Sequence, residues 1–157
     1  PQHGTSRRQR QMCIRDRDGV FREGLKPGEK SGIPKRDPVP EGLPWQKEMA
    51  PDVVQLFRFS AITFNPHRIH YDRTYAMEVE GYPGLVVHGP FTTQCLLDLV
   101  RDMNPDKTMK KFDMRARAPL FDTAPFTVCG RPTDDGCEVW AATPEGTVAM
   151  QARVEFA

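Results

Sequence analysis

The most regular pattern of apolar and polar positions lies at the C-terminal end of the chain. Over residues 147–156 apolar side chains alternate with mostly polar ones, and the apolar positions are Val148, Met150, Ala152, Val154 and Phe156. A period of two places successive side chains on opposite faces of a strand. We therefore predict a strand here that buries one of its faces.

Shorter segments with the same period precede it. The stretch KFDMRARAPL places Phe112, Met114 and Ala116 on one face and Asp113, Arg115 and Arg117 on the other. We also predict strands in FTVCGR and CEVWAAT, and the turn PEG connects the latter to the last strand. The alternation in VVQLFRFSAITF, over residues 53–64, predicts a further strand near the start of the domain.

One segment has the spacing of a long helix. Over residues 90–103 the apolar positions recur every three or four residues, as Phe91, Cys95, Leu96, Leu99, Val100 and Met103. We expect Gly89 to be its N-cap and Pro90 its first helical residue, with NP at 104–105 ending it. A shorter helix is predicted in DRTYAMEVE, closed by GYPG.

The first fifty residues lack such a pattern. Prolines and glycines crowd the stretch from residue 26 to 51, which predicts a disordered or extended arm over 1–50 and a domain over 51–157. MCIRDR resembles the translated end of a transposon-based sequencing adaptor, so residues 1–17 are predicted not to be biological sequence.

Composition narrows the function. With 157 residues, a net charge of +1 and no apolar run of membrane-spanning length, the chain favours one cytoplasmic domain without nucleic-acid or membrane binding. The four cysteines lack CxxC spacing and are interpreted as reduced thiols. An apolar helix needs a sheet to cover it, so the elements predict an α+β fold in which an antiparallel sheet is wrapped around one long central helix.

The stretch RFSAITFNPHRIHYDRTYAMEVEGYPGLVVHGP closely resembles the MaoC-like hotdog-fold dehydratases. The nearest branch comprises the type-2 3-hydroxyacyl-thioester dehydratases and the mesaconyl-C4-CoA hydratases. The resemblance implies a C-terminal hotdog unit and a hydro-lyase that adds or removes water at the 2,3 position of an acyl thioester. It implies no cofactor beyond the CoA or acyl-carrier thioester of the substrate, and a partner that is a second copy or a second hotdog unit.

The resemblance also implies the site residues. His70 takes the place of the family's acid/base histidine, whereas Asn65 stands where the wider family has an aspartate and cannot titrate. Asp72 either supports this site or caps the short helix. The resemblance assigns Gly89 to the oxyanion hole, where the start of a helix offers unpaired N–H groups.

Other residues are open to two interpretations. His88 either fixes the site's structure or binds substrate, and Tyr82 and Pro90 are candidate substrate contacts; Arg115 and Arg117 either meet CoA phosphates or are ordinary exposed arginines. His67 is expected at the surface or beside the site. The spacing HxxHxD with His88 gives no supported zinc pattern, so no metal is expected. The alternatives in function are a non-catalytic acyl-CoA-binding half-domain that completes a partner's pocket, and a hotdog thioesterase.

Overall fold

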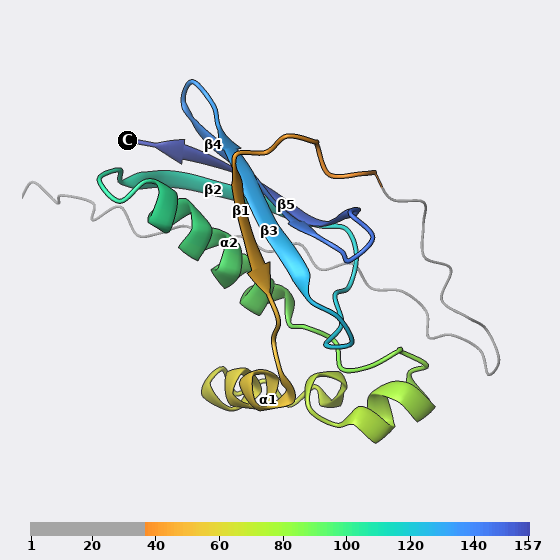
Figure 1. Ribbon diagram of the computed structural model, residues 1–157. Helices are drawn as coiled ribbons and strands as arrows, with labels where there is room; N and C mark the ends of the chain where they lie inside the picture. The colour runs from red at the N-terminus through yellow and green to blue at the C-terminus, as the bar shows by residue number, and fades with distance from the viewer. Residues whose placement is uncertain (1–36) are drawn as a thin grey trace, which may run out of the picture. The chain divides into compact units, whose positions relative to one another are not determined.

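The structure is a computed structural model that describes residues 37–157. Residues 1–36 of the arm expected over 1–50 lie outside the described residues, and with them the proposed adaptor segment at 1–17 and Cys13. In the described part, five strands form one antiparallel sheet in the order β1-β3-β4-β5-β2 (Figure 1). They are β1 Trp45–Met49, β2 Met109–Ala116, β3 Phe126–Pro132, β4 Gly136–Ala142 and β5 Val148–Phe156.

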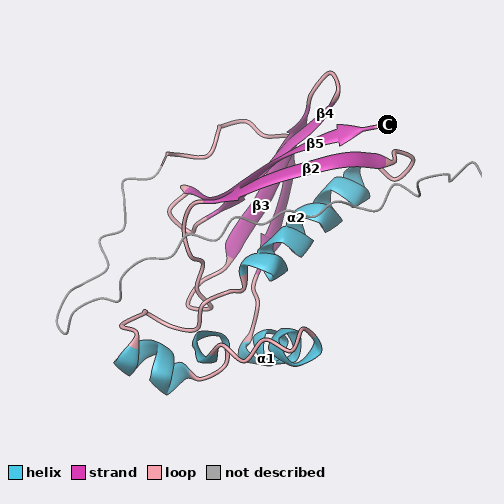
Figure 2. Ribbon diagram, turned by 180° about the vertical axis from the view of Figure 1, so that it is seen from behind, coloured by secondary structure: helices cyan, strands magenta, loops and turns pink. Residues whose placement is uncertain are grey.

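The helix α2, Gly89–Met103, lies across one face of this sheet and contacts β1, β3 and β4 (Figure 2). Its buried face is formed by Thr92, Cys95, Leu96, Leu99 and Val100. These side chains pack against fully buried strand residues such as Phe126, Val128, Val139 and Val154. The predicted architecture of an antiparallel sheet around a long helix is therefore confirmed, as is the helix end at Asn104.

The outer face of the sheet carries a second, smaller apolar cluster. It consists of Leu43, Cys129, Trp140 and Val148, with Val39 packed against it. Strict alternation predicted that Val148 and Met150 share a face, but they belong to different clusters. The reason is a bulge that shifts the pairing between β4 and β5 at Ala141/Ala142. The segment before β1 covers this face, and the amide N–H of Val39 donates to the carbonyl of Gly146.

The strand predicted over 53–64 is wrong. Those residues form the helix α1, Val53–Ile62. A reciprocal capping box starts it, in which the Asp52 carboxylate accepts from the Gln55 N–H while the Gln55 side chain accepts from the Asp52 N–H. Leu56 and Ser60, four residues apart, are its buried positions. The cap and these tertiary contacts override the alternation of apolar and polar residues from which a strand was predicted.

The folded unit begins earlier than residue 51, the expected domain boundary. β1 lies within the expected arm and pairs along its whole length with β3, from Trp45 opposite Gly130 to Met49 opposite Phe126. Five residues between prolines gave too short a pattern to recognise as a strand. As an edge strand, β1 needs only one neighbour, which allows this short segment to complete the sheet.

α1 and two short helical segments lie together at the N-terminal end of α2 (Figures 1 and 2). The segments are a 3₁₀ turn at Arg68–His70 and a π-helical turn at Tyr75–Val79, the latter within the predicted short helix. None of the helices in the described range has the length and hydropathy needed to cross a membrane. The motif of the sequence analysis is thus gathered at one end of the fold.

Candidate active site

Two histidines from separate parts of the motif lie face to face at the N-terminal end of α2. The rings of His70 and His88 are stacked, with centroids 3.7 Å apart and planes 18° from parallel. Only 8% of His70 and 1% of His88 is exposed to solvent. The edge of the His67 ring meets His70 at a centroid distance of 5.6 Å. The structure therefore brings together two predicted site residues that are eighteen positions apart.

His70 is held by the backbone. Its Nδ1 lies 2.7 Å from the carbonyl oxygen of Val86, in the segment that leads to α2. A carbonyl can only accept, so Nδ1 carries the proton and Nε2 keeps a free lone pair. Burial lowers the pKa of His70. Two smaller effects also act on it: the hydrogen bond to Val86 raises the pKa, and the charge of His67 lowers it. The imidazole is thus neutral and able to accept a proton near neutral pH.

His88 is bonded to a residue that the sequence analysis did not single out. Its Nε2 lies 2.8 Å from the hydroxyl oxygen of Ser60 in α1, and Phe59 contacts the ring at a centroid distance of 4.8 Å. Its Nδ1 is buried without a hydrogen-bond partner among the described residues. Burial, reinforced by His70, lowers the pKa of His88 to about 4. Recognising 53–62 as a helix would have identified Ser60, since it lies one turn after the buried Leu56.

The end of α1 places Asn65 beside Ser60. The Asn65 N–H donates to the Ser60 carbonyl and the Phe64 N–H to the Ala61 carbonyl, which is the Schellman arrangement at a helix C-terminus. Phe64 adopts the left-handed conformation that this requires, with φ of 52°, where glycine is usual. The Asn65 side-chain oxygen accepts from the His67 N–H, which leaves its amide group as a donor.

A cavity opens beside these residues. It has a volume of about 360 Å³ and mostly apolar walls, to which Ser60 contributes a hydroxyl group and Asn65 an amide group. Its other lining residues are Phe57, Ala61, Phe64, Pro66 and Tyr71. This hollow is open to solvent, and Ser60, which lines it, connects it to the buried histidine pair through its contact with His88.

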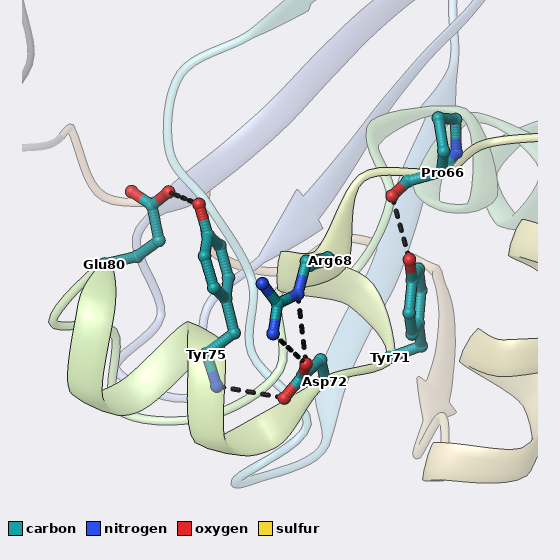
Figure 3. A network of polar contacts seen from close by, with 6 residues as sticks. All are labelled: Pro66, Arg68, Tyr71, Asp72, Tyr75 and Glu80. Carbon is teal, nitrogen blue, oxygen red and sulfur yellow. Dashed lines mark hydrogen bonds and ion pairs between the residues drawn. The ribbon is translucent and has the colours of Figure 1, made fainter.

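Asp72 acts as a cap. Its carboxylate accepts from the Tyr75 N–H at 3.0 Å and forms an ion pair with Arg68 at 2.7 Å (Figure 3). These two interactions, the backbone bond first, lower the pKa of Asp72. The His70 ring is oriented by Val86 instead. Of the two interpretations of Asp72, the structure therefore favours the capping of the short helix.

The start of α2 lies next to the stacked rings. Its N-cap is His88 and its first residue is Gly89, so the prediction of Gly89 as N-cap was wrong by one position. His88 has extended dihedrals and its carbonyl accepts from the Thr92 N–H, which makes it the first acceptor of the helix. A Cβ on Gly89 would meet no atom within 4 Å, so the backbone there borders open space. Pro90 is also exposed.

The remaining candidates lie apart from the rings. Tyr82 is half-buried against Phe121 at a centroid distance of 5.8 Å. Arg115 lines a separate cavity of about 360 Å³ together with Trp140, on the outer face of the sheet. Arg117 is exposed, and its backbone N–H donates to Ala149. The geometry does not join the two arginines to the histidine pair.

The described cysteines are buried thiols without disulfide bonds. They are Cys95, Cys129 and Cys137, and burial raises the pKa of each to about 11. A thiol with so high a pKa is a poor nucleophile at neutral pH. Within residues 37–157 no three histidine, cysteine or acidic side chains are grouped closely enough to hold a metal ion.

Comparison with known proteins identifies the family of the chain. A model of the family "hydroxyacyl-thioester dehydratase type 2" matches residues 2–122. The chain belongs to this family. It is 44% identical to mesaconyl-C(4)-CoA hydratase of Chloroflexus aurantiacus over 151 residues, which cover 92% of this chain and 51% of that protein. The chain thus spans about half the length of this relative.

A second relative agrees with the family, and a solved structure agrees with the fold. The mitochondrial hydroxyacyl-thioester dehydratase type 2 of Schizosaccharomyces pombe is 40% identical over 81 residues, 50% of this chain and 27% of that protein. The (R)-hydratase from A. caviae involved in PHA biosynthesis superposes with a TM-score of 0.63 at 16% identity, covering 73% of this chain and 97% of that one. The resemblance to the hotdog-fold dehydratases is therefore confirmed, and the fold of this family member is the hotdog fold.

Proposed function

We propose that the chain is the catalytic hotdog unit of a hydro-lyase that reversibly adds water to the 2,3 double bond of an enoyl thioester. The observation that carries this proposal is a neutral, buried His70 with a free Nε2, next to the start of α2. Family membership and the names of the relatives support the same reaction class. Their names also favour a CoA thioester of the mesaconyl-C4 type as substrate.

In the hydration direction, His70 Nε2 removes a proton from a water molecule as its oxygen bonds to Cβ of the substrate. The electron pair of the double bond moves toward the thioester carbonyl and gives an enolate. The protonated His70 then returns a proton to Cα, so that water is added in full. Asn65 cannot titrate, but its amide can donate to the attacking water and orient it.

The enolate oxygen needs hydrogen-bond donors. The first N–H groups of a helix have no partner within it, and the helix dipole favours negative charge there. Gly89 supplies such an N–H beside open space that a thioester carbonyl can enter. Loss of one oxyanion donor typically lowers the rate by ~10²–10³.

The central experiment compares the wild type with His70→Ala on crotonyl-CoA, mesaconyl-C4-CoA and 3-hydroxyacyl-CoA. Removing the base should lower kcat by ~10²–10⁴ without unfolding the protein. The matched control is His67→Ala, which removes an exposed histidine three residues away and should keep most of the activity. Equal rates in the wild type and His70→Ala would refute the proposal.

Gly89→Ala tests the start of α2. The new methyl group would meet no protein atom, so folding should be unaffected or improved. Activity should fall, since the methyl would occupy space that the proposal gives to the substrate. Turnover and thermal unfolding of the same preparation measure both effects, and unchanged activity would remove Gly89 from the oxyanion hole.

A second hotdog unit is the partner that we propose. The chain covers 51% of the mesaconyl-C(4)-CoA hydratase, so that relative has room for another unit of this size. For the unit described by this sequence, the partner would be a second copy of itself or another hotdog unit. Acyl-CoA or acyl-carrier thioesters would then bind between the two units.

The alternative function is a half-domain that binds acyl-CoA and completes a partner's pocket without turnover. One observation favours keeping it: the chain spans about half the length of its relative. Binding of crotonyl-CoA without turnover in either the wild type or His70→Ala would establish it. Release of free CoA from a saturated acyl-CoA would instead indicate a thioesterase.

A further inference from the structure

Ser60 makes a polar contact that the helix α1 does not need for its own stability. It is only 5% exposed, and its hydroxyl oxygen lies 2.8 Å from His88 Nε2, across 28 residues of sequence. Another hydroxyl of the region, Thr63 at the C-cap of α1, donates to the Phe59 carbonyl of the same helix. The Ser60 hydroxyl thus links α1 to the ring that is stacked on His70.

The hydrogen bonds define how protons are distributed over the two rings. If His88 carried its proton on Nδ1, a buried N–H would lack an acceptor among the described residues. With the proton on Nε2, the ring donates to Ser60 and only a lone pair is left unpaired, which costs less. His70 has the opposite tautomer, because its Nδ1 donates to Val86.

The stack keeps both rings uncharged before the reaction. Among residues 37–157, the titratable groups that face His70 are His67 and His88, and the one that faces His88 is His70. Phe59 and the Ser60 hydroxyl also contact the His88 ring, and neither carries a charge. Since protonated His88 would need an acceptor at Nδ1, the proton taken from water belongs on His70.

We propose that Ser60 is a positioning residue, whose hydroxyl holds the His88 ring flat against His70 and thereby aims His70 Nε2 at the substrate. This role rests on the proposed hydratase function and adds to it a residue outside the histidine motif. Ser60 also lines the apolar cavity with Asn65, so the same side chain connects the cavity wall to the stacked rings. The face of the His88 ring then restricts rotation of the His70 ring, because the two rings are stacked.

The first test is the ¹⁵N NMR spectrum of the histidine rings in the wild-type protein. We expect His70 as the Nδ1–H tautomer and His88 as the Nε2–H tautomer, with His88 uncharged at pH 6. This measurement needs neither activity nor a variant, so it remains decisive if the hydratase proposal fails. An Nδ1–H tautomer or a titration of His88 near its ordinary pKa would overturn the inference.

The second test is the variant series Ser60→Ala, Ser60→Thr and the matched control Thr63→Ala. Ser60→Ala should give His88 a mixture of tautomers, shift the acid limb of the kcat–pH profile and lower kcat about tenfold, less than loss of the general base itself. KM should change less than kcat. Ser60→Thr keeps the hydroxyl and should recover the profile, and Thr63→Ala should behave as the wild type. Wild-type tautomers or a wild-type profile in a folded Ser60→Ala would each overturn the role.

Discussion

At the scale of single residues, the decisive feature is a buried histidine that stays neutral. His88 is almost fully buried, and its only hydrogen bond among the described residues is to the neutral hydroxyl of Ser60. No carboxylate compensates a positive charge there, so burial lowers its pKa from 6.5 to about 4. Burial likewise lowers the pKa of His70, with a smaller contribution from His67 in the same direction. Stability should therefore depend on pH through these two rings.

We predict that the free energy of unfolding decreases as the pH falls from about 6.5 to about 4. In that range the unfolded chain binds a proton at His88 and the folded chain does not, so acid favours unfolding. His88 lowers the free energy of unfolding by at most about 3 kcal/mol between these two pH values. The lowered pKa of His70 acts in the same direction. Asp72 and Asp135, whose pKa values are also lowered, act only below this range.

Urea denaturation at several pH values measures this dependence. The matched variant is His88→Gln, which removes the titrating ring and should flatten the curve between pH 6.5 and 4. If the free energy of unfolding fell equally steeply with pH in both proteins, the pKa of His88 would be the same in the folded and unfolded chain, and the prediction would be wrong.

At the scale of elements, the C-terminus of α1 contains a strained residue. Phe64 has φ of 52° at the position where helices usually end in glycine, and 93% of its surface is exposed. A left-handed conformation costs a side-chain-bearing residue roughly 1–2 kcal/mol, and so exposed a ring recovers little of this by burial. Backbone strain is common at functional sites, so a strained residue in the cavity wall suggests that Phe64 contacts a partner or ligand.

We predict that Phe64→Gly raises the free energy of unfolding by about 1 kcal/mol, because glycine adopts this conformation without a clash. Phe64→Ala is the matched control, since it removes the ring but keeps a Cβ in the strained position. Its stability should remain close to that of the wild type. Chemical denaturation at low protein concentration is the measurement, and destabilisation by Phe64→Gly would contradict the assignment of strain.

At the scale of the whole molecule, α1 and the segment after it expose a set of large apolar side chains. Phe64, Ile62 and Val79 are the most exposed, and Phe57, Val54 and Val53 follow. All except Val79, which ends the π-helical turn, border the cavity next to Ser60 and Asn65 or lie on α1. Exposed apolar side chains in this number favour association, which agrees with the proposed second hotdog unit.

We predict that the wild-type chain forms a dimer through this surface. Its mass in solution should be about twice the 17.8 kDa of one chain. Both Phe64→Ala and Phe64→Gly should weaken the dimer, although only the glycine variant is expected to stabilise the helix end. Light scattering coupled to size exclusion gives the mass, and a monodisperse wild-type monomer would argue against a partner copy.

Several features of the fold and the site followed from the sequence because they depend on local pattern. The period of two in the last strand and the helical spacing over 90–103 are properties of neighbouring residues, and the histidines and Gly89 were recognisable from their motif. Tertiary structure decided the rest. Whether 53–62 became a strand or a helix depended on the Asp52 cap and on burial of Leu56 and Ser60 against distant segments. The stacking of His70 on His88 depended on the Val86 carbonyl and the Ser60 hydroxyl, and contacts between residues far apart in the chain leave no periodic trace in the sequence.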